Sequence, residues 1–160
     1  MKKSLITIVS IILLLSFVSC SGGEFTDSKG ATEIATAISS AITTDGGTKT
    51  LDSDAILEIS DDKISYLKDF VMVKAKNAKN INEYGIFRVE NGKAEEMKAL
   101  VSAYVENLQK IYRAMDYFPE EVEKIDFATV KVFGNYVVYS FLNESDTDAF
   151  HSAIKAEISK

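Results

Sequence analysis

His151 is the only histidine in the chain, so it is the only side chain whose ordinary pKa suits general acid-base catalysis near neutral pH. A serine- or cysteine-type hydrolase needs such a base beside a nucleophile and an orienting carboxylate. The single cysteine, Cys20, lies about ten residues before the first expected helix, far from any such set. A lone histidine near the start of a helix is usually a surface or boundary residue. We therefore assign no catalytic residue from the sequence.

Acidic residues alternate just before the last expected helix, in a pattern that could bind calcium. Glu144, Asp146 and Asp148 have the spacing of a calcium loop, and Glu157 falls at its twelfth position counted from Asp146. The sixth position is His151, where such a loop needs glycine. Helix capping and the helix dipole explain the same acids, so we expect no metal site and no cofactor. A second acidic cluster is expected to be a solvated helix face: Glu120, Glu121, Glu123 and Asp126.

Two further sets of side chains could bind a ligand without catalysing a reaction. Lys74, Lys76 and Lys79 form a small basic patch that could contact an anionic partner, although lysines also protect the edges of sheets from pairing. Tyrosines are numerous, and several on one uncovered sheet face could bind a peptide or a glycan. They are Tyr66, Tyr84, Tyr104, Tyr112, Tyr117, Tyr136 and Tyr139.

The leader gives the most specific motif in the sequence. Lys2 and Lys3 precede an apolar run over 5–17, which is too short for a membrane span but typical of a signal peptide. The sequence FVSC over 17–20 then resembles the lipobox of bacterial lipoproteins. This resemblance implies cleavage before Cys20 and attachment of a diacylglycerol to its sulfur. Phe17 and the valine after it depart from the residues usual at those positions. The alternative is an ordinary secreted protein cut near position 19.

The predicted organisation is a signal peptide over 1–19, a lipidated cysteine with a flexible polar tether over 20–30, and one domain over 31–160. Removing the two leader lysines lowers the formal charge from -6 to -8. An acidic surface argues against nucleic acid as a partner and against a polybasic membrane contact. Membrane attachment would therefore depend on the lipid.

One long helix is the element around which the domain is expected to form. Residues 93–117 contain no Gly or Pro, and their apolar side chains recur at steps of three and four. Shorter helices are expected over 31–42 and 146–158, with a brief one from 52 to 59.

Four runs of residues are expected to form strands, in two hairpins. The runs 69–75 and 84–89 are rich in β-branched and aromatic residues, and a polar turn joins them. In the second hairpin, Gly134 and Asn135 separate 129–133 from 136–142. A two-residue turn there places Phe133 opposite Tyr136. The predicted fold is α+β: an antiparallel sheet of about four strands in two layers, packed against the long central helix and a C-terminal helix.

With these elements in place, the chain resembles an uncharacterised family of Gram-positive bacterial lipoproteins, domain of unknown function 4358. The residues that carry the resemblance are Cys20 in its lipobox, the run EYGIFRV over 83–89 that leads into the long helix, and GNYVV over 134–138. The resemblance implies the anchor and the fold, and it brings no established activity.

These observations favour a lipid-anchored binding or interaction module of unknown ligand at the extracytoplasmic face of the cell membrane. A protein, a peptide and a glycan are the candidate ligands. Two alternatives remain open: a small cell-envelope hydrolase or other enzyme, and an accessory subunit of a membrane complex. An enzyme would need a pocket in which polar groups converge, whereas an accessory subunit would expose an unusually apolar face.

Overall fold

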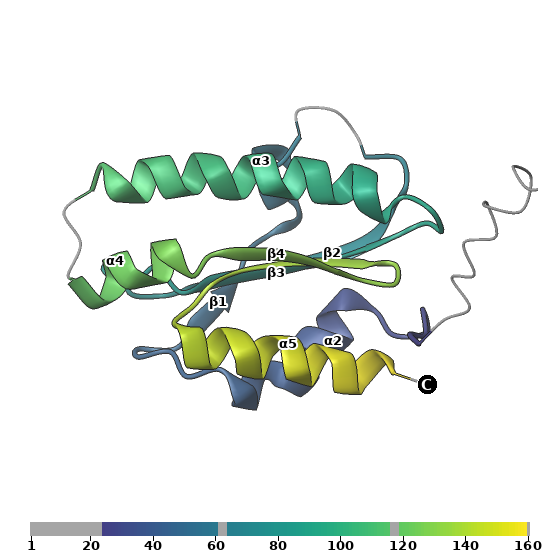
Figure 1. Cartoon of the computed structure of the whole chain (residues 1–160), viewed down its shortest axis with the longest axis horizontal. Coiled ribbons are helices and arrows are strands. Elements are labelled where there is room, and N and C mark those ends of the chain that lie inside the picture. Colours follow the sequence, from purple (N-terminus) through teal and green to yellow (C-terminus); the bar gives the residue numbers. More distant parts are fainter. Residues whose placement is uncertain (1–23, 61–63, 116–118, 160) are drawn as a thin grey trace, which may run out of the picture.

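The computed structural model describes residues 24–60, 64–115 and 119–159. Within them an antiparallel sheet packs against helices (Figure 1), which confirms the predicted α+β class. The strands are β1 (Thr48–Thr50), β2 (Leu67–Ala75), β3 (Glu83–Val89), β4 (Thr129–Phe133) and β5 (Tyr136–Phe141). The helices are α2 (Ala31–Ile38), α3 (Ala94–Arg113), α4 (Pro119–Asp126) and α5 (Glu144–Ile158), with short 3-10 helices η1 (Ser39–Ala41) and η2 (Ser53–Glu58).

The sheet has the strand order β1-β2-β3-β5-β4, and the neighbouring strands are antiparallel throughout. Both predicted hairpins form. In the second, Phe133 lies opposite Tyr136, as the two-residue turn predicts, and Gly134 has a φ of 58°.

The predicted two-layer arrangement is wrong, because helices cover both faces of the sheet (Figure 1). One core lies between the sheet and α3, where Phe87 of β3 packs with Met97. A second core lies between the sheet and the pair α2 and α5, where Ile86 of β3 packs with Ile34 and Phe150. Every residue of β5 is buried, because this central strand is covered on both sides. The domain therefore has three layers.

The sheet also has one strand more than the four predicted. The additional strand, β1, is only three residues long, and its side chains are polar and exposed. It pairs at the edge with β2, where Thr48 lies opposite Ala75. A short polar edge strand has no apolar alternation, so the hydrophobic pattern could not reveal it.

Residues 25–30 contact the folded domain. The prediction of a flexible tether over 20–30 is therefore wrong for residues 25–30. Phe25 forms an isolated antiparallel bridge with Ser159, and the Thr26 amide donates to the Ile158 carbonyl at 2.6 Å. We call residues 25–30 the docked segment. The predicted signal peptide over 1–19 and the predicted lipidation site Cys20 lie outside the described residues.

Candidate functional site

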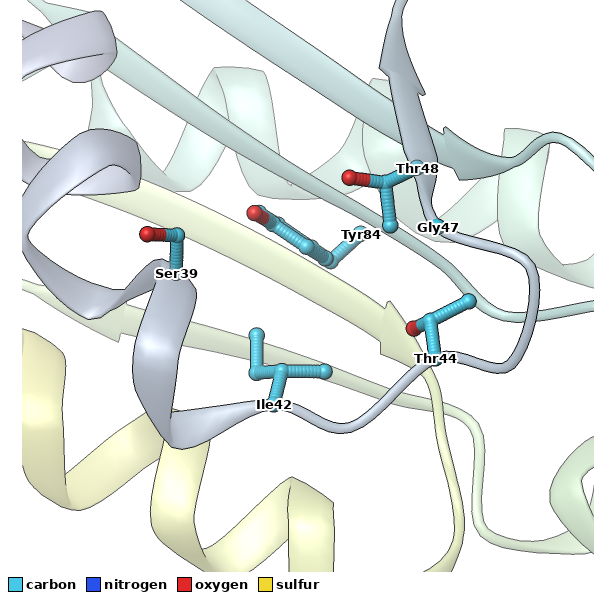
Figure 2. Close-up of a pocket in the computed structure, with 6 residues that line it drawn as sticks. All are labelled: Ser39, Ile42, Thr44, Gly47, Thr48 and Tyr84. Carbon is cyan, nitrogen blue, oxygen red and sulfur yellow. The ribbon is translucent and has the colours of Figure 1, made fainter.

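A pocket of about 210 Å³ opens where η1, the following loop, β1 and β3 meet (Figure 2). Its lining residues come from the segment that joins α2 to the sheet and from one residue of β3. They are Ser39, Ile42, Thr44, Gly47, Thr48 and Tyr84.

Local sequence explains how this loop encloses the pocket. Gly46 and Gly47 both have φ near +79°, a conformation that residues with a Cβ rarely adopt, so the Gly-Gly pair lets the chain turn back into β1. The Asn82 side-chain amide donates to the Thr43 carbonyl at 3.2 Å and to Thr44 Oγ1 at 3.1 Å. These two bonds fasten the loop to the start of β3.

The polar groups of the pocket are hydroxyls. Figure 2 shows the Tyr84 phenol extending between Ser39 and Thr48, with Ile42 and Thr44 on the other side. Tyr84 is 5% exposed, and burial raises the pKa of its phenol, which favours the neutral form. No hydrogen bond from this hydroxyl to another described residue is present, and none of the six lining residues is charged. The pocket can therefore offer hydrogen bonds and an aromatic edge to a neutral ligand, but no acid or base.

A second polar cluster is buried except for its partly exposed lysine. Glu83 is fully buried on the α3 side of the sheet, where its carboxylate accepts hydrogen bonds from three tyrosine hydroxyls. Tyr104 and Tyr139 donate to Oε1 at 2.8 and 2.7 Å, and Tyr112 donates to Oε2 at 3.2 Å. Lys74 Nζ lies 3.0 Å from Oε2 and also donates to the Tyr112 hydroxyl at 3.1 Å.

Mutual stabilisation within this cluster argues for a structural role. Burial would lower the pKa of Lys74, but the adjacent Glu83 and Tyr112 outweigh it and raise the pKa. Burial, together with Glu83, raises the pKa of Tyr112 to about 12 and that of Tyr104 further. The lysine therefore stays charged and the phenols stay neutral across the physiological range, so none of them is prepared to act as a base or a nucleophile.

Gly85 makes room for this cluster. It lies opposite Tyr139 in the β3–β5 pairing. A Cβ at position 85 would approach Tyr139 Cε1 to 2.3 Å, far inside van der Waals contact. The glycine thus lets the Tyr139 ring lie across β3 and bring its hydroxyl to Glu83. The run 83–89 contains Glu83 and Gly85, but its residue types indicate only a strand.

His151 lies in the core, unlike the surface or boundary residue that the sequence suggested. It is 5% exposed, and its Nε2 is 3.3 Å from Thr129 Oγ1. Burial, with the positive charges of Lys131 and Lys155, lowers its pKa to about 4, although Asp148 opposes the shift. The imidazole is neutral at pH 7 and is enclosed by core side chains, away from the pocket.

Two of the acidic residues, Glu144 and Asp146, lie in the first turn of α5, where the helix dipole favours negative charge. Asn143, which precedes them, is the N-cap, and its side chain accepts from the Asp146 amide at 2.8 Å. Within the described ranges, no group of three His, Cys, Asp or Glu side chains has a geometry suited to a metal ion.

In the second acidic cluster, Glu120, Glu123 and Asp126 are exposed as predicted, whereas Glu121 is buried. Its carboxylate accepts from the Ile81 amide at 2.8 Å and from Lys124 at 2.7 Å. The bond from Ile81 connects α4 to the loop before β3.

The described structure presents neither the three-lysine basic patch nor the uncovered tyrosine-bearing sheet face that the sequence suggested. Lys74 is bound to Glu83, which removes it from the basic patch. Helices cover both sheet faces, so no bare face presents the tyrosines, and four of them are buried in the described core alongside Tyr84: Tyr104, Tyr112, Tyr136 and Tyr139.

Exposed large apolar side chains are few in the described parts of the chain. Those present are Leu57, Ile111, Met115 and Val122. Among the helices that the structure describes, none has the length and hydrophobicity needed to cross a bilayer.

Residues 39–142 match the model of a family described as a domain of unknown function (DUF4358). The chain belongs to this family. The matched region contains every residue that lines the pocket and every member of the Glu83 cluster. It excludes α2, α5 and the docked segment, although α2 and α5 cover one entire face of the DUF4358 sheet. Searches of curated proteins and of solved structures gave no significant match.

Proposed function

We propose that this DUF4358 protein is a lipid-anchored binding module at the extracytoplasmic face of the cell membrane, and that its ligand is a neutral, hydroxyl-bearing molecule such as one sugar unit of an envelope glycan. The observation that carries the proposal is a pocket lined by hydroxyls and one tyrosine, with no charged side chain.

The anchor is supported by the sequence before the domain. Cys20 is the only cysteine, so no intramolecular disulfide explains it, and it follows directly on the apolar run of the leader. The docked segment begins only five residues later, at Phe25. A thioether-linked diacylglycerol at Cys20 would place two acyl chains in the bilayer, and two chains hold a protein stably where one does not.

The ligand class follows from the pocket's size and chemistry. A volume of about 210 Å³ is below the range of pockets that enclose drug-sized ligands, so one small unit would fit. A charged ligand would lose hydration without meeting an opposite charge. A sugar unit could exchange hydrogen bonds with Tyr84, Thr44 and Thr48 and place its apolar face against Ile42.

The anchor is tested by intact-mass analysis of the membrane fraction from cells that express the protein or its Cys20→Ala variant. We expect the wild-type chain to start at Cys20 and to carry a diacylglyceryl group, and the variant to be released or left unprocessed. Unmodified wild-type protein outside the cell would contradict the anchor.

The pocket is tested by titrating ¹⁵N-labelled protein with glucose and with N-acetylglucosamine. We expect the amide resonances of Gly46 and Gly47 to shift, with dissociation constants of the order of 1 mM for a single unit. Tyr84→Phe should weaken binding severalfold while keeping the ring. Tyr66→Phe is the matched control, because Tyr66 packs on the opposite side of the sheet. Equal binding by all three proteins, or no shift, would contradict the pocket assignment.

A further inference from the structure

We infer that the docked segment holds the domain in a fixed orientation on the membrane: the end that carries the β4–β5 turn faces the lipid surface, and the pocket is presented away from it. This inference rests on the proposed lipid anchor at Cys20. It adds an interaction surface whose partner is the bilayer that holds the anchor.

The docked segment is attached to the domain by several elements at once. Asp27 pairs with Lys68 of β2 at 2.6 Å and with Arg88 of β3 at 2.8 Å, and it accepts from Asn135 of the β4–β5 turn at 3.1 Å. The Lys29 carbonyl accepts from the Tyr136 hydroxyl at 2.7 Å.

The C-terminal helix holds the same segment from another side. The Lys29 ammonium pairs with Glu157 of α5 at 2.6 Å. Phe25 packs edge-on against Phe133, with 5.9 Å between the ring centroids. Contacts with four strands, a turn and a helix leave the docked segment little freedom to move relative to the domain.

The chain between the anchor and the docked segment is short. Five residue steps separate Cys20 from Phe25, and a fully extended chain spans at most about 17 Å over that distance. The helix α3 has 20 residues and is about 30 Å long, so the tether is shorter than the domain. Phe25 must therefore stay near the headgroups that hold Cys20.

The pocket lies at the other end of the sheet. The docked segment contacts Lys68 at the start of β2, whereas the pocket loop contacts its far end, where Thr48 pairs with Ala75. Seven residue steps along β2 correspond to about 23 Å. Figure 1 shows the same separation, with the docked segment beside the C-terminus and the β4–β5 turn, and β1 toward the other end.

The membrane-facing end has side chains suited to a lipid surface. Phe25 is only partly buried, and Lys131 and Lys155 are exposed near Phe133, with the Lys155 ammonium 5.6 Å from the ring centre. Asp27 is the one acidic residue of the docked segment, and it is paired with Lys68 and Arg88. An aromatic ring and exposed lysines at headgroup level are favourable partners of anionic lipids.

The orientation is tested on lipidated protein reconstituted in vesicles that contain anionic lipid and a headgroup-bound quencher. A fluorophore is placed on a new cysteine, either Ser159→Cys beside the docked segment or Asp45→Cys beside the pocket. We expect severalfold stronger quenching at position 159 than at position 45. The added variant Asp27→Ala should reduce this contrast, because release of the docked segment lengthens the tether. Circular dichroism checks that each variant is folded.

Equal quenching at the two positions, or a contrast that Asp27→Ala leaves unchanged, would overturn the inference. Intact-mass analysis distinguishes this result from failure of the anchor, because it shows whether Cys20 carries the diacylglyceryl group. When Cys20 is a thioether, the introduced cysteine is the only reactive thiol, so the fluorophore labels that position alone. If Cys20 proves unmodified, the proposed anchor fails. The orientation is then measured on protein coupled at Cys20 to a maleimide lipid, with the fluorophore on an azide-bearing residue at position 159 or 45.

Discussion

His151 lies between two aromatic rings, with its ring centre 6.0 Å from that of Phe133 and 5.6 Å from that of Phe150. This position makes the residue a source of acid sensitivity instead of a catalyst. The unfolded chain takes up a proton near pH 6.5, whereas burial keeps the folded imidazole neutral down to about pH 4.

The protein should therefore lose stability as the pH falls from about 6.5 to about 4, because the unfolded state binds the proton first. The full shift corresponds to an upper limit of roughly 3.4 kcal/mol in the free energy of unfolding. Urea unfolding of the wild type and of His151→Gln at pH 7.0, 5.5 and 4.5 measures this loss. The variant should show a smaller decrease across the interval, and identical pH dependence in the two proteins would rule the explanation out.

Single residues also show what the sequence could not reveal. The residue types of Glu83, Tyr104 and Tyr139 can be read from the sequence. Nothing in their spacing indicates that a strand, a helix and a second strand bring one carboxylate oxygen and two hydroxyl oxygens together. The turn at Gly46 and Gly47 was predictable from its chemistry. The role of Tyr84 in the pocket depends on the loop folding back over β3, which no local pattern specifies.

Among the elements, α3 is positioned on the sheet by polar contacts as well as by its apolar face. Two of its tyrosines, Tyr104 and Tyr112, are eight residues apart and both donate to Glu83. An apolar stripe alone tolerates sliding and rotation, whereas two hydrogen bonds to one carboxylate fix the helix along and around its axis.

Glu83→Gln should destabilise the protein by about 3 kcal/mol, because the amide leaves Lys74 without its buried counter-charge and turns a donor toward other donors. Denaturant unfolding followed by circular dichroism measures this change. The matched control is Glu95→Gln on α3, where the exposed carboxylate lies 3.6 Å from Lys98 and should contribute less than about 0.5 kcal/mol. A loss no greater than that of the control would exclude the stabilising role of the cluster.

Elements in which apolar residues recur with a clear period were predictable from the sequence, and elements without such a period were not. The central helix, the last helix and both hairpins follow from apolar spacing and turn residues. The strand β1 has only threonine and lysine, and tertiary pairing with β2 alone makes it a strand. The sequence also could not assign helices to sheet faces, since the buried runs of β3 and β5 suit a sheet covered on one side or on both.

At the scale of the whole molecule, different parts of the chain cover the two faces of the sheet. The face under α3 is completed within the region that matches DUF4358. The opposite face is completed by α2 and α5, which come from the two ends of the domain. The predicted single domain over 31–160 therefore depends on sequence at both of its ends to bury its second core.

The bridge between Phe25 and Ser159 joins residues near the two ends of the described chain. Such a contact spans almost the whole chain and is among the last that folding can form, because its loop-closure entropy is the largest. During synthesis, α5 emerges last, so the core beneath it stays open until nearly the entire chain is free. In the exported protein that we propose, the second core can therefore close only after both ends of the domain have reached the same side of the membrane.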